Sequence, residues 1–133
     1  MSMTVTKQMV EEFVEKLENT HEDIIRQSGG EQGVRDTGGL AHAAFEILAA
    51  FEKYPNNPFR VAAVIYHMLA TRHYFVDGNK RTSHVVAQTW LLSSGYDFNV
   101  EYEEAVPFII SIAQDKPIKE IEEWIKENAV KTC

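Results

Sequence analysis

The pattern of apolar and polar positions along the chain is helical over most of its length. After Thr6, a residue type suited to cap a helix, apolar residues recur every three or four positions as far as Leu17. The same spacing returns from Leu40 to Phe51. We therefore expect two amphipathic helices here, each with one face against a core.

One segment, FRVAAVIYHMLA at 59–70, is apolar on nearly every face, which is typical of a helix surrounded by other helices. It follows Asn57 and Pro58, which suit the cap and the first turn of a helix. Further helical patterns lie at 85–92, 105–113 and 118–125. The sequence therefore predicts an all-α fold of about six helices, with the apolar segment as its central helix.

Two segments break the helical pattern. Residues 28–39, SGGEQGVRDTGG, hold five of the seven glycines and almost no large apolar side chain, so we expect a mobile, glycine-rich flap. Residues 96–102, YDFNVEY, alternate only weakly, and we interpret them as a short extended link rather than a strand. Neither segment divides the chain, so residues 1–133 are expected to form a single domain.

Composition narrows the class of protein. The formal net charge of −7 argues against direct binding of nucleic acid, which needs a basic face to neutralise phosphates. The single cysteine, Cys133, is the last residue, so we expect no internal disulfide and a cytoplasmic location. No apolar run is long enough to span a bilayer and the first residues lack the apolar core of a signal peptide, so no membrane association is expected.

Most of the candidate chemistry lies in one stretch between two apolar helices, HYFVDGNKRTS at 73–83. If the second helix begins near Asn79, its first backbone amides are free and lie at the positive end of the helix dipole, which favours an anion such as phosphate. Gly78 lets a phosphate approach the backbone closely, and two adjacent cations add charge. The candidate phosphate or nucleotide ligands are Gly78, Asn79, Lys80, Arg81 and Thr82.

Three other residues of this stretch suit further roles. A carboxylate repels a neighbouring phosphate unless a divalent cation lies between them. Asp77 is therefore a candidate magnesium ligand. Imidazole titrates near neutral pH, so His73 suits a general base that takes a proton from an attacking hydroxyl. We expect Phe75 to point inwards and anchor the loop. An ordinary polar turn is the alternative, because Asp-Gly is a common turn dipeptide and Asn a common cap.

The order of these residues resembles the signature of the Fic/Doc superfamily, which reads His-x-Phe-x-(Asp/Glu)-Gly-Asn-(Gly/Lys)-Arg. The matching residues are His73, Phe75, Asp77, Gly78, Asn79 and Arg81. The segment GVRDTGGLAHAAF at 33–45 is similar to the loop and helix found upstream in the Doc, or death-on-curing, branch. The likeness covers roughly residues 22–125 and implies an all-helical Fic/Doc-like fold and the toxin half of a toxin–antitoxin pair.

Two positions separate the branches of this superfamily. Lys80 stands where AMP-transferring Fic enzymes carry glycine, and His84 where many of them carry a second arginine that binds phosphate. By analogy with Doc, the resemblance implies an ATP- and Mg²⁺-dependent kinase that phosphorylates a threonine of an elongation factor and blocks protein synthesis. Gly78 points the other way, because the founding member of the Doc branch has alanine there. AMP transfer to a protein hydroxyl and a non-catalytic domain that binds an anion or a partner remain the alternatives.

The resemblance also implies that Arg35 and Asp36 lie on a flap that holds the target protein against the site; a simple linker is the alternative. The inhibitory pattern of some Fic proteins, Ser/Thr-x-x-x-Glu-(Gly/Asn), does not occur in the chain. We therefore expect inhibition, where it exists, to come from a partner protein, an antitoxin.

Four further histidines, His21, His42, His67 and His84, raise the alternative of a metal site. A metal-dependent phosphohydrolase of the HD type needs a His-Asp doublet, and the chain has none. We expect His67 to be a hydrogen-bonded core residue, and His84 to border the site.

Overall fold

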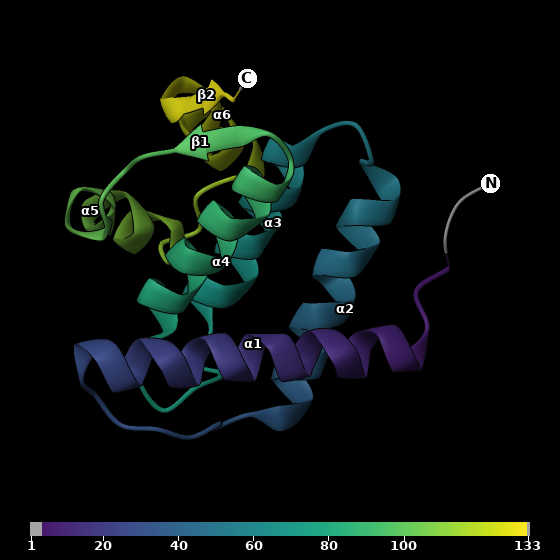
Figure 1. The fold of residues 1–133 in the computed structure, drawn as a ribbon, viewed down its shortest axis with the longest axis vertical. Helices are drawn as coiled ribbons and strands as arrows, with labels where there is room; N and C mark the ends of the chain where they lie inside the picture. The colour runs from purple at the N-terminus through teal and green to yellow at the C-terminus, as the bar shows by residue number, and fades with distance from the viewer. Residues whose placement is uncertain (1–3, 133) are drawn as a thin grey trace.

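The computed structural model describes residues 4–132, which form six helices and one two-stranded sheet (Figure 1). The predicted all-α fold in a single compact domain is confirmed. The expectation for Cys133 concerns a residue outside this range. The elements are α1 Lys7–Ser28, α2 Thr37–Lys53, α3 Pro58–Thr71, α4 Asn79–Ser93, β1 Tyr96–Phe98, α5 Tyr102–Ile112, α6 Ile118–Asn128 and β2 Ala129–Lys131.

Helix α3 is the centre of the fold, as its apolar sequence predicts. It contacts α2, α4, α5 and α6. Asn57 caps its first turn, with the side-chain oxygen accepting from the Arg60 amide at 3.2 Å, and Pro58 occupies the first helical position. The buried residues of α3 are Val61, Ala62, Ala63, Ile65, Tyr66, Leu69 and Ala70. The core therefore surrounds this helix on several sides.

Helix α1 crosses the bundle below the ends of α3 and α4 and in front of the lower part of α2 (Figure 1), and it contacts α2 and α4. Thr6 caps it, with Oγ1 accepting from the Met9 amide at 3.2 Å. Its buried residues are Leu17, His21, Ile24 and Ile25, which share one face at helical spacing. The C-terminal half of α1 therefore lies against the loop between α3 and α4, where the candidate residues are.

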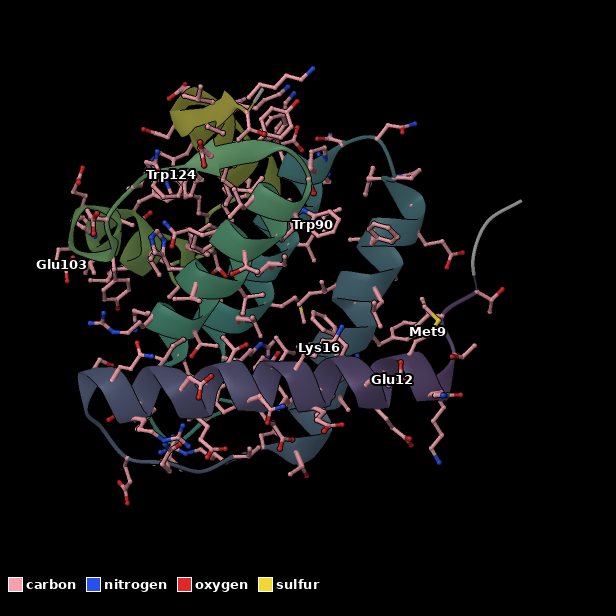
Figure 2. The ribbon with its side chains drawn as sticks, in the orientation of Figure 1. Met9, Glu12, Lys16, Trp90, Glu103 and Trp124 are labelled. Atoms are coloured by element: carbon pink, nitrogen blue, oxygen red, sulfur yellow. The ribbon has the colours of Figure 1, made fainter. Side chains whose placement is uncertain are left out.

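The two tryptophans, labelled in Figure 2, tie the upper elements to the central helix. The Trp90 indole N–H of α4 donates to the backbone oxygen of Pro58 at 2.9 Å. Trp124 of α6 stacks on Phe108 of α5, with 4.0 Å between ring centroids, and meets Tyr66 of α3 edge-on. These contacts fix α4 and α6 against the central helix.

The sheet is the main difference from the predicted fold. β2 pairs antiparallel with β1, so that Tyr96 lies opposite Lys131 and Phe98 opposite Ala129. The first of these strands falls within the segment interpreted as an extended link, while the second was not predicted. Strands of three residues contain too few positions to establish an alternating pattern.

The glycine-rich segment is also shorter than predicted, because α2 begins at Thr37 rather than near Leu40. Asp36 caps α2, with its side chain accepting from the Gly39 amide at 2.8 Å. The last residues of the expected flap are therefore helical, and the connecting loop covers residues 29–36.

Among residues 4–132, none of the helices combines the length and the apolar character that crossing a bilayer requires.

Candidate functional site

The candidate stretch lies where α3 gives way to α4, in a loop that is anchored to the core. Phe75 is 1% exposed and stacks on the His21 ring of α1, with 3.9 Å between the centroids. Tyr74 beside it is buried as well. The inward direction expected of Phe75 is therefore what the structure shows.

Asn79 holds the loop in shape from the first position of α4. Its side-chain oxygen accepts from the Phe75 amide, and its side-chain nitrogen donates to the Phe75 carbonyl, both at 3.0 Å. The capping position belongs to Gly78, which has φ of 76°, in the left-handed region that favours glycine. Asn79 therefore fixes the turn that presents the start of α4.

Asp77 connects the loop to two other segments through its backbone and side chain. One carboxylate oxygen accepts from the Gly78 amide at 2.9 Å, and the other accepts from the Glu31 amide at 3.2 Å. Nε2 of His21 donates to the Asp77 backbone oxygen at 2.7 Å. Each carboxylate oxygen keeps a second lone pair, so the side chain can still coordinate a cation.

One cavity of about 580 Å³ brings most of the predicted residues together. Its lining includes His73, Asp77, Gly78, Asn79, Lys80, Arg81 and Arg35. The other three predicted residues do not line it: Phe75 and Thr82 are buried in the core, and Asp36 caps α2. The sequence stretch and the segment before α2 therefore meet at one concave site.

The free amides at the start of α4 are fewer than expected. Within residues 4–132, the backbone N–H groups of Asn79, Lys80 and Arg81 have no backbone acceptor. The Gly78 amide is taken by Asp77, and the Thr82 amide donates to the Gly78 oxygen at 3.0 Å. Thr82 is also fully buried, so the structure does not present it as a phosphate ligand. Three adjacent amides remain at the positive end of the helix.

The cavity is positive, although the chain as a whole is acidic. Lys80, Arg81 and Arg35 line it, and none of them has a carboxylate within 4.0 Å in the described part of the chain. The guanidinium carbon of Arg81 lies 4.2 Å from the ring centroid of Tyr102. Cations without an internal partner, next to free amides, are suited to bind an anion.

The loop that carries Arg35 is bonded to both neighbouring segments. The Arg35 amide donates to the Tyr74 oxygen at 2.7 Å, and the Val76 amide donates to the Gly33 oxygen at 3.0 Å. These bonds place the loop beside the α3–α4 junction and bring Arg35 to the cavity. The mobility of this loop remains a prediction.

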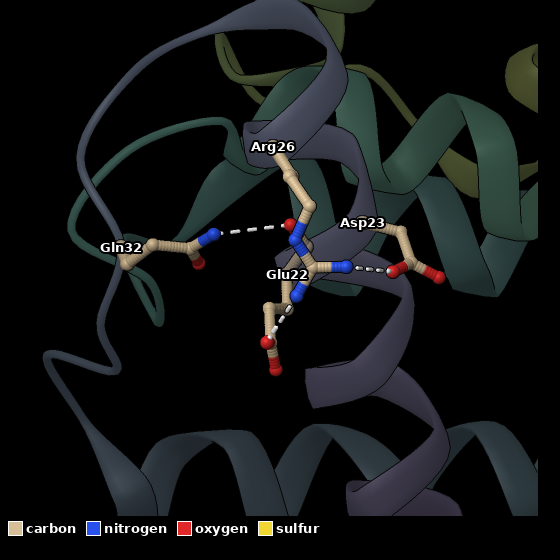
Figure 3. Close-up of polar contacts among 4 residues, drawn as sticks. All are labelled: Glu22, Asp23, Arg26 and Gln32. Carbon is tan, nitrogen blue, oxygen red and sulfur yellow. Dashed lines mark hydrogen bonds and ion pairs between the residues drawn. The ribbon is translucent and has the colours of Figure 1, made fainter.

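A second anchor of this loop lies on α1 (Figure 3). The Gln32 side chain donates to the backbone oxygen of Glu22 at 3.0 Å. Arg26 pairs with the side chains of both Glu22, at 2.5 Å, and Asp23, at 3.1 Å. The backbone of Glu22 therefore supports the loop from a part of α1 that does not line the cavity.

His84 is a buried residue that does not line this cavity, but it lines a neighbouring pocket that shares Arg81 and Tyr102 with it. Its Nε2 lies 2.7 Å from the Val100 oxygen, which can only accept, so this nitrogen carries the proton. Nδ1 accordingly accepts from the Tyr66 hydroxyl at 2.6 Å. Both nitrogens of the neutral ring are therefore satisfied.

Because His84 is buried in its neutral form, we expect the free energy of unfolding to fall in acid. Burial is the main cause that lowers the pKa of His84 from its ordinary value of 6.5. The unfolded chain then binds a proton more readily than the folded one, so stability is full above about pH 6.5 and declines as the pH falls toward the folded pKa. Urea unfolding measures the free energy of unfolding at pH 7.5 and 5.5. Its decrease between these pH values should be smaller for His84→Gln than for wild type. An equal loss in both proteins would contradict the assignment.

The other histidines are not gathered at a metal site in the described residues, and their surroundings differ. The described residues hold no group of three or more His, Cys, Asp or Glu side chains placed to bind a metal. His67 is only half-buried, and its Nδ1 has no hydrogen-bond partner in this part of the chain, so the expectation of a hydrogen-bonded core residue is wrong. His21 is one of the residues whose role was missed, although its place four residues after Leu17 puts it on the buried face of α1.

The polar groups of the cavity are of the types that can hold a nucleoside triphosphate together with magnesium. Its volume is within the range of about 300 to 1,000 Å³ that ligand sites have. The amides of α4, together with Lys80 and Arg81, can bind phosphate oxygens. Asp77 offers one carboxylate, and Mg²⁺ is commonly held by one or two carboxylates together with substrate phosphates and water.

Comparison with known families agrees with this geometry. A family model described as the Fic/DOC family matches residues 11–91, which is more than half of the chain. The match includes all of α2 and α3, the loop that carries His73 and most of α4. A comparison with curated proteins gave no match. The chain therefore belongs to the Fic/DOC family, which is generally a family of transferases that commonly act on proteins.

Proposed function

We propose that this protein transfers the γ-phosphate of ATP to a hydroxyl of a target protein, as toxins of the Doc branch do. The observation that carries the proposal is that Lys80 lines the same cavity as His73 and Asp77. A lysine at this position adds a full positive charge beside the free amides of α4, where AMP-transferring relatives have a glycine with no side chain.

Each residue of the site has a role in this proposal. The amides at the start of α4, with Lys80 and Arg81, bind the phosphates of ATP. His73 takes the proton of the target hydroxyl, whose oxygen then attacks the γ-phosphorus while the bond to ADP breaks. A magnesium ion on Asp77 supplies neutralisation of phosphate charge. Arg35, on the loop beside the cavity, contacts the incoming target segment.

The proposed target is a threonine of a translation elongation factor, whose phosphorylation would block protein synthesis. A toxin of this kind is neutralised by a second protein, so an antitoxin partner belongs to the same proposal. Both rest on the likeness of the site to the Doc branch, with Lys80 as the residue that supports that branch.

AMP transfer is the second candidate, and Gly78 is the observation that favours it. This glycine stands where the founding member of the Doc branch has alanine. A Cβ added at Gly78 would lie 2.8 Å from Cδ1 of Ile25, and its φ of 76° is also unfavourable for alanine. The local structure therefore suits glycine, as in the other branch.

Transfer of label tests these candidates against each other. The protein and magnesium are incubated with an elongation factor and with ATP labelled either at the γ- or at the α-phosphate. We expect the γ-label on the factor, and loss of that signal when EDTA removes magnesium. Label from the α-phosphate would select AMP transfer instead. If neither label is transferred while ATP still binds, the domain binds anions without catalysis.

A further inference from the structure

Tyr102 contributes to the wall of the cavity from an element that is remote in sequence. It is the first residue of α5, and it lies outside the family match at residues 11–91. The guanidinium carbon of Arg81 lies 4.2 Å from its ring centroid, and both side chains line the cavity. The ring therefore directly contacts Arg81, a candidate phosphate-binding residue.

The contact is made with the face of a neutral ring. Burial raises the pKa of Tyr102, so its hydroxyl stays protonated at neutral pH and offers no negative charge. In the described part of the chain, Arg81 also has no carboxylate within 4.0 Å. A cation over an aromatic face within about 6 Å is attracted by the ring quadrupole. Because a guanidinium has five N–H donors, Arg81 can contact the ring and still donate to phosphate.

The ring of Tyr102 is itself held by the core. It is half-buried, and its centroid lies 5.9 Å from that of the His84 ring. His84 is fixed in turn by its hydrogen bonds to Tyr66 and Val100. The ring face presented to Arg81 is therefore set by the same core that supports α4.

We propose that Tyr102 is a positioning residue, whose ring face holds the Arg81 guanidinium so that its N–H groups are available to the phosphates of bound ATP. The inference rests on the proposed function in that ATP is the ligand of this cavity. An arginine placed beforehand loses less side-chain freedom on binding, so ATP binds more tightly.

The first test is calorimetric binding of ATP with magnesium to wild type, Tyr102→Leu and Tyr102→Phe. We expect Tyr102→Leu to raise the dissociation constant roughly 2- to 5-fold, the size of one cation–π contact. Tyr102→Phe keeps the ring face and should bind as wild type does. In transfer assays Tyr102→Leu should raise KM for ATP and leave kcat unchanged. A merely structural role would lower the folded fraction, and thus kcat, with KM unchanged.

The second test is a double-mutant cycle with Arg81→Ala. If Tyr102 acts through Arg81, Tyr102→Leu should have no further effect on ATP binding when Arg81 is already absent. Equal effects in both backgrounds, or wild-type binding by Tyr102→Leu, would overturn the inference. Melting temperatures show whether each variant is folded, and Tyr102→Gln replaces the leucine variant if that one does not fold.

Ligand binding by wild type distinguishes a failure of this inference from a failure of the proposed function. Wild type is also titrated with inorganic tripolyphosphate, which carries the phosphates alone. Binding of neither ligand by wild type would overturn the proposed function, and the inference with it. Binding by wild type that Tyr102→Leu leaves unchanged would overturn the inference alone.

Discussion

Replacing His73 with alanine is expected to lower the rate of phosphate transfer about 10²- to 10⁴-fold, the usual contribution of a positioned general base. His73 lines the cavity and is exposed to solvent, so removal of the ring leaves the packing of the core unchanged. We therefore expect ATP binding and the melting temperature to stay at wild-type values. Initial rates of label transfer at saturating ATP measure the effect.

The matched control for this variant is His42→Ala. His42 lies on α2, has a side chain that is 64% exposed, and is not part of the cavity lining. It should transfer phosphate at the wild-type rate. Equal rates for wild type and His73→Ala would contradict the role of His73 as the base.

Replacing Phe75 with alanine is expected to lower the free energy of unfolding by about 3 to 5 kcal/mol, as for other buried aromatic side chains. Phe75 is 1% exposed, and its ring is nearly parallel to that of His21, at an interplanar angle of 6°. Its loss leaves a void under the loop and removes the stacking partner of His21. Urea unfolding measures the change, and anion binding should weaken in parallel because the loop presents the start of α4.

The control for this change is Phe45→Ala on α2. Phe45 is 43% exposed, so its removal should cost far less stability than that of Phe75. If the two variants lost similar free energies of unfolding, Phe75 would not anchor the loop.

The helices could be predicted because each has an apolar face or, in α3, apolar residues on nearly every side. The start of α2 could not, because its first turn contains two glycines and depends on the cap that Asp36 supplies. The pairing of β1 with β2 joins segments that are distant in sequence, and no local pattern reports such a contact.

The candidate site was predictable to the extent that its residues are close together in the chain. Their order places Asp77, Lys80 and Arg81 around the start of α4 whatever the rest of the fold does. The turn of the helix then directs Thr82 into the core, which spacing alone did not reveal. His21 and Tyr102 come from α1 and α5, so only the tertiary structure brings them to the loop and to Arg81.

The most direct test of phosphate transfer is mass spectrometry of a cell extract treated with the protein, ATP and magnesium. It reports the group transferred and the modified protein in one measurement. The account predicts a gain of about 80 Da on a threonine of an elongation factor, present with wild type and absent with His73→Ala. A gain of about 329 Da, the mass of an added AMP group, or an unchanged spectrum would contradict it.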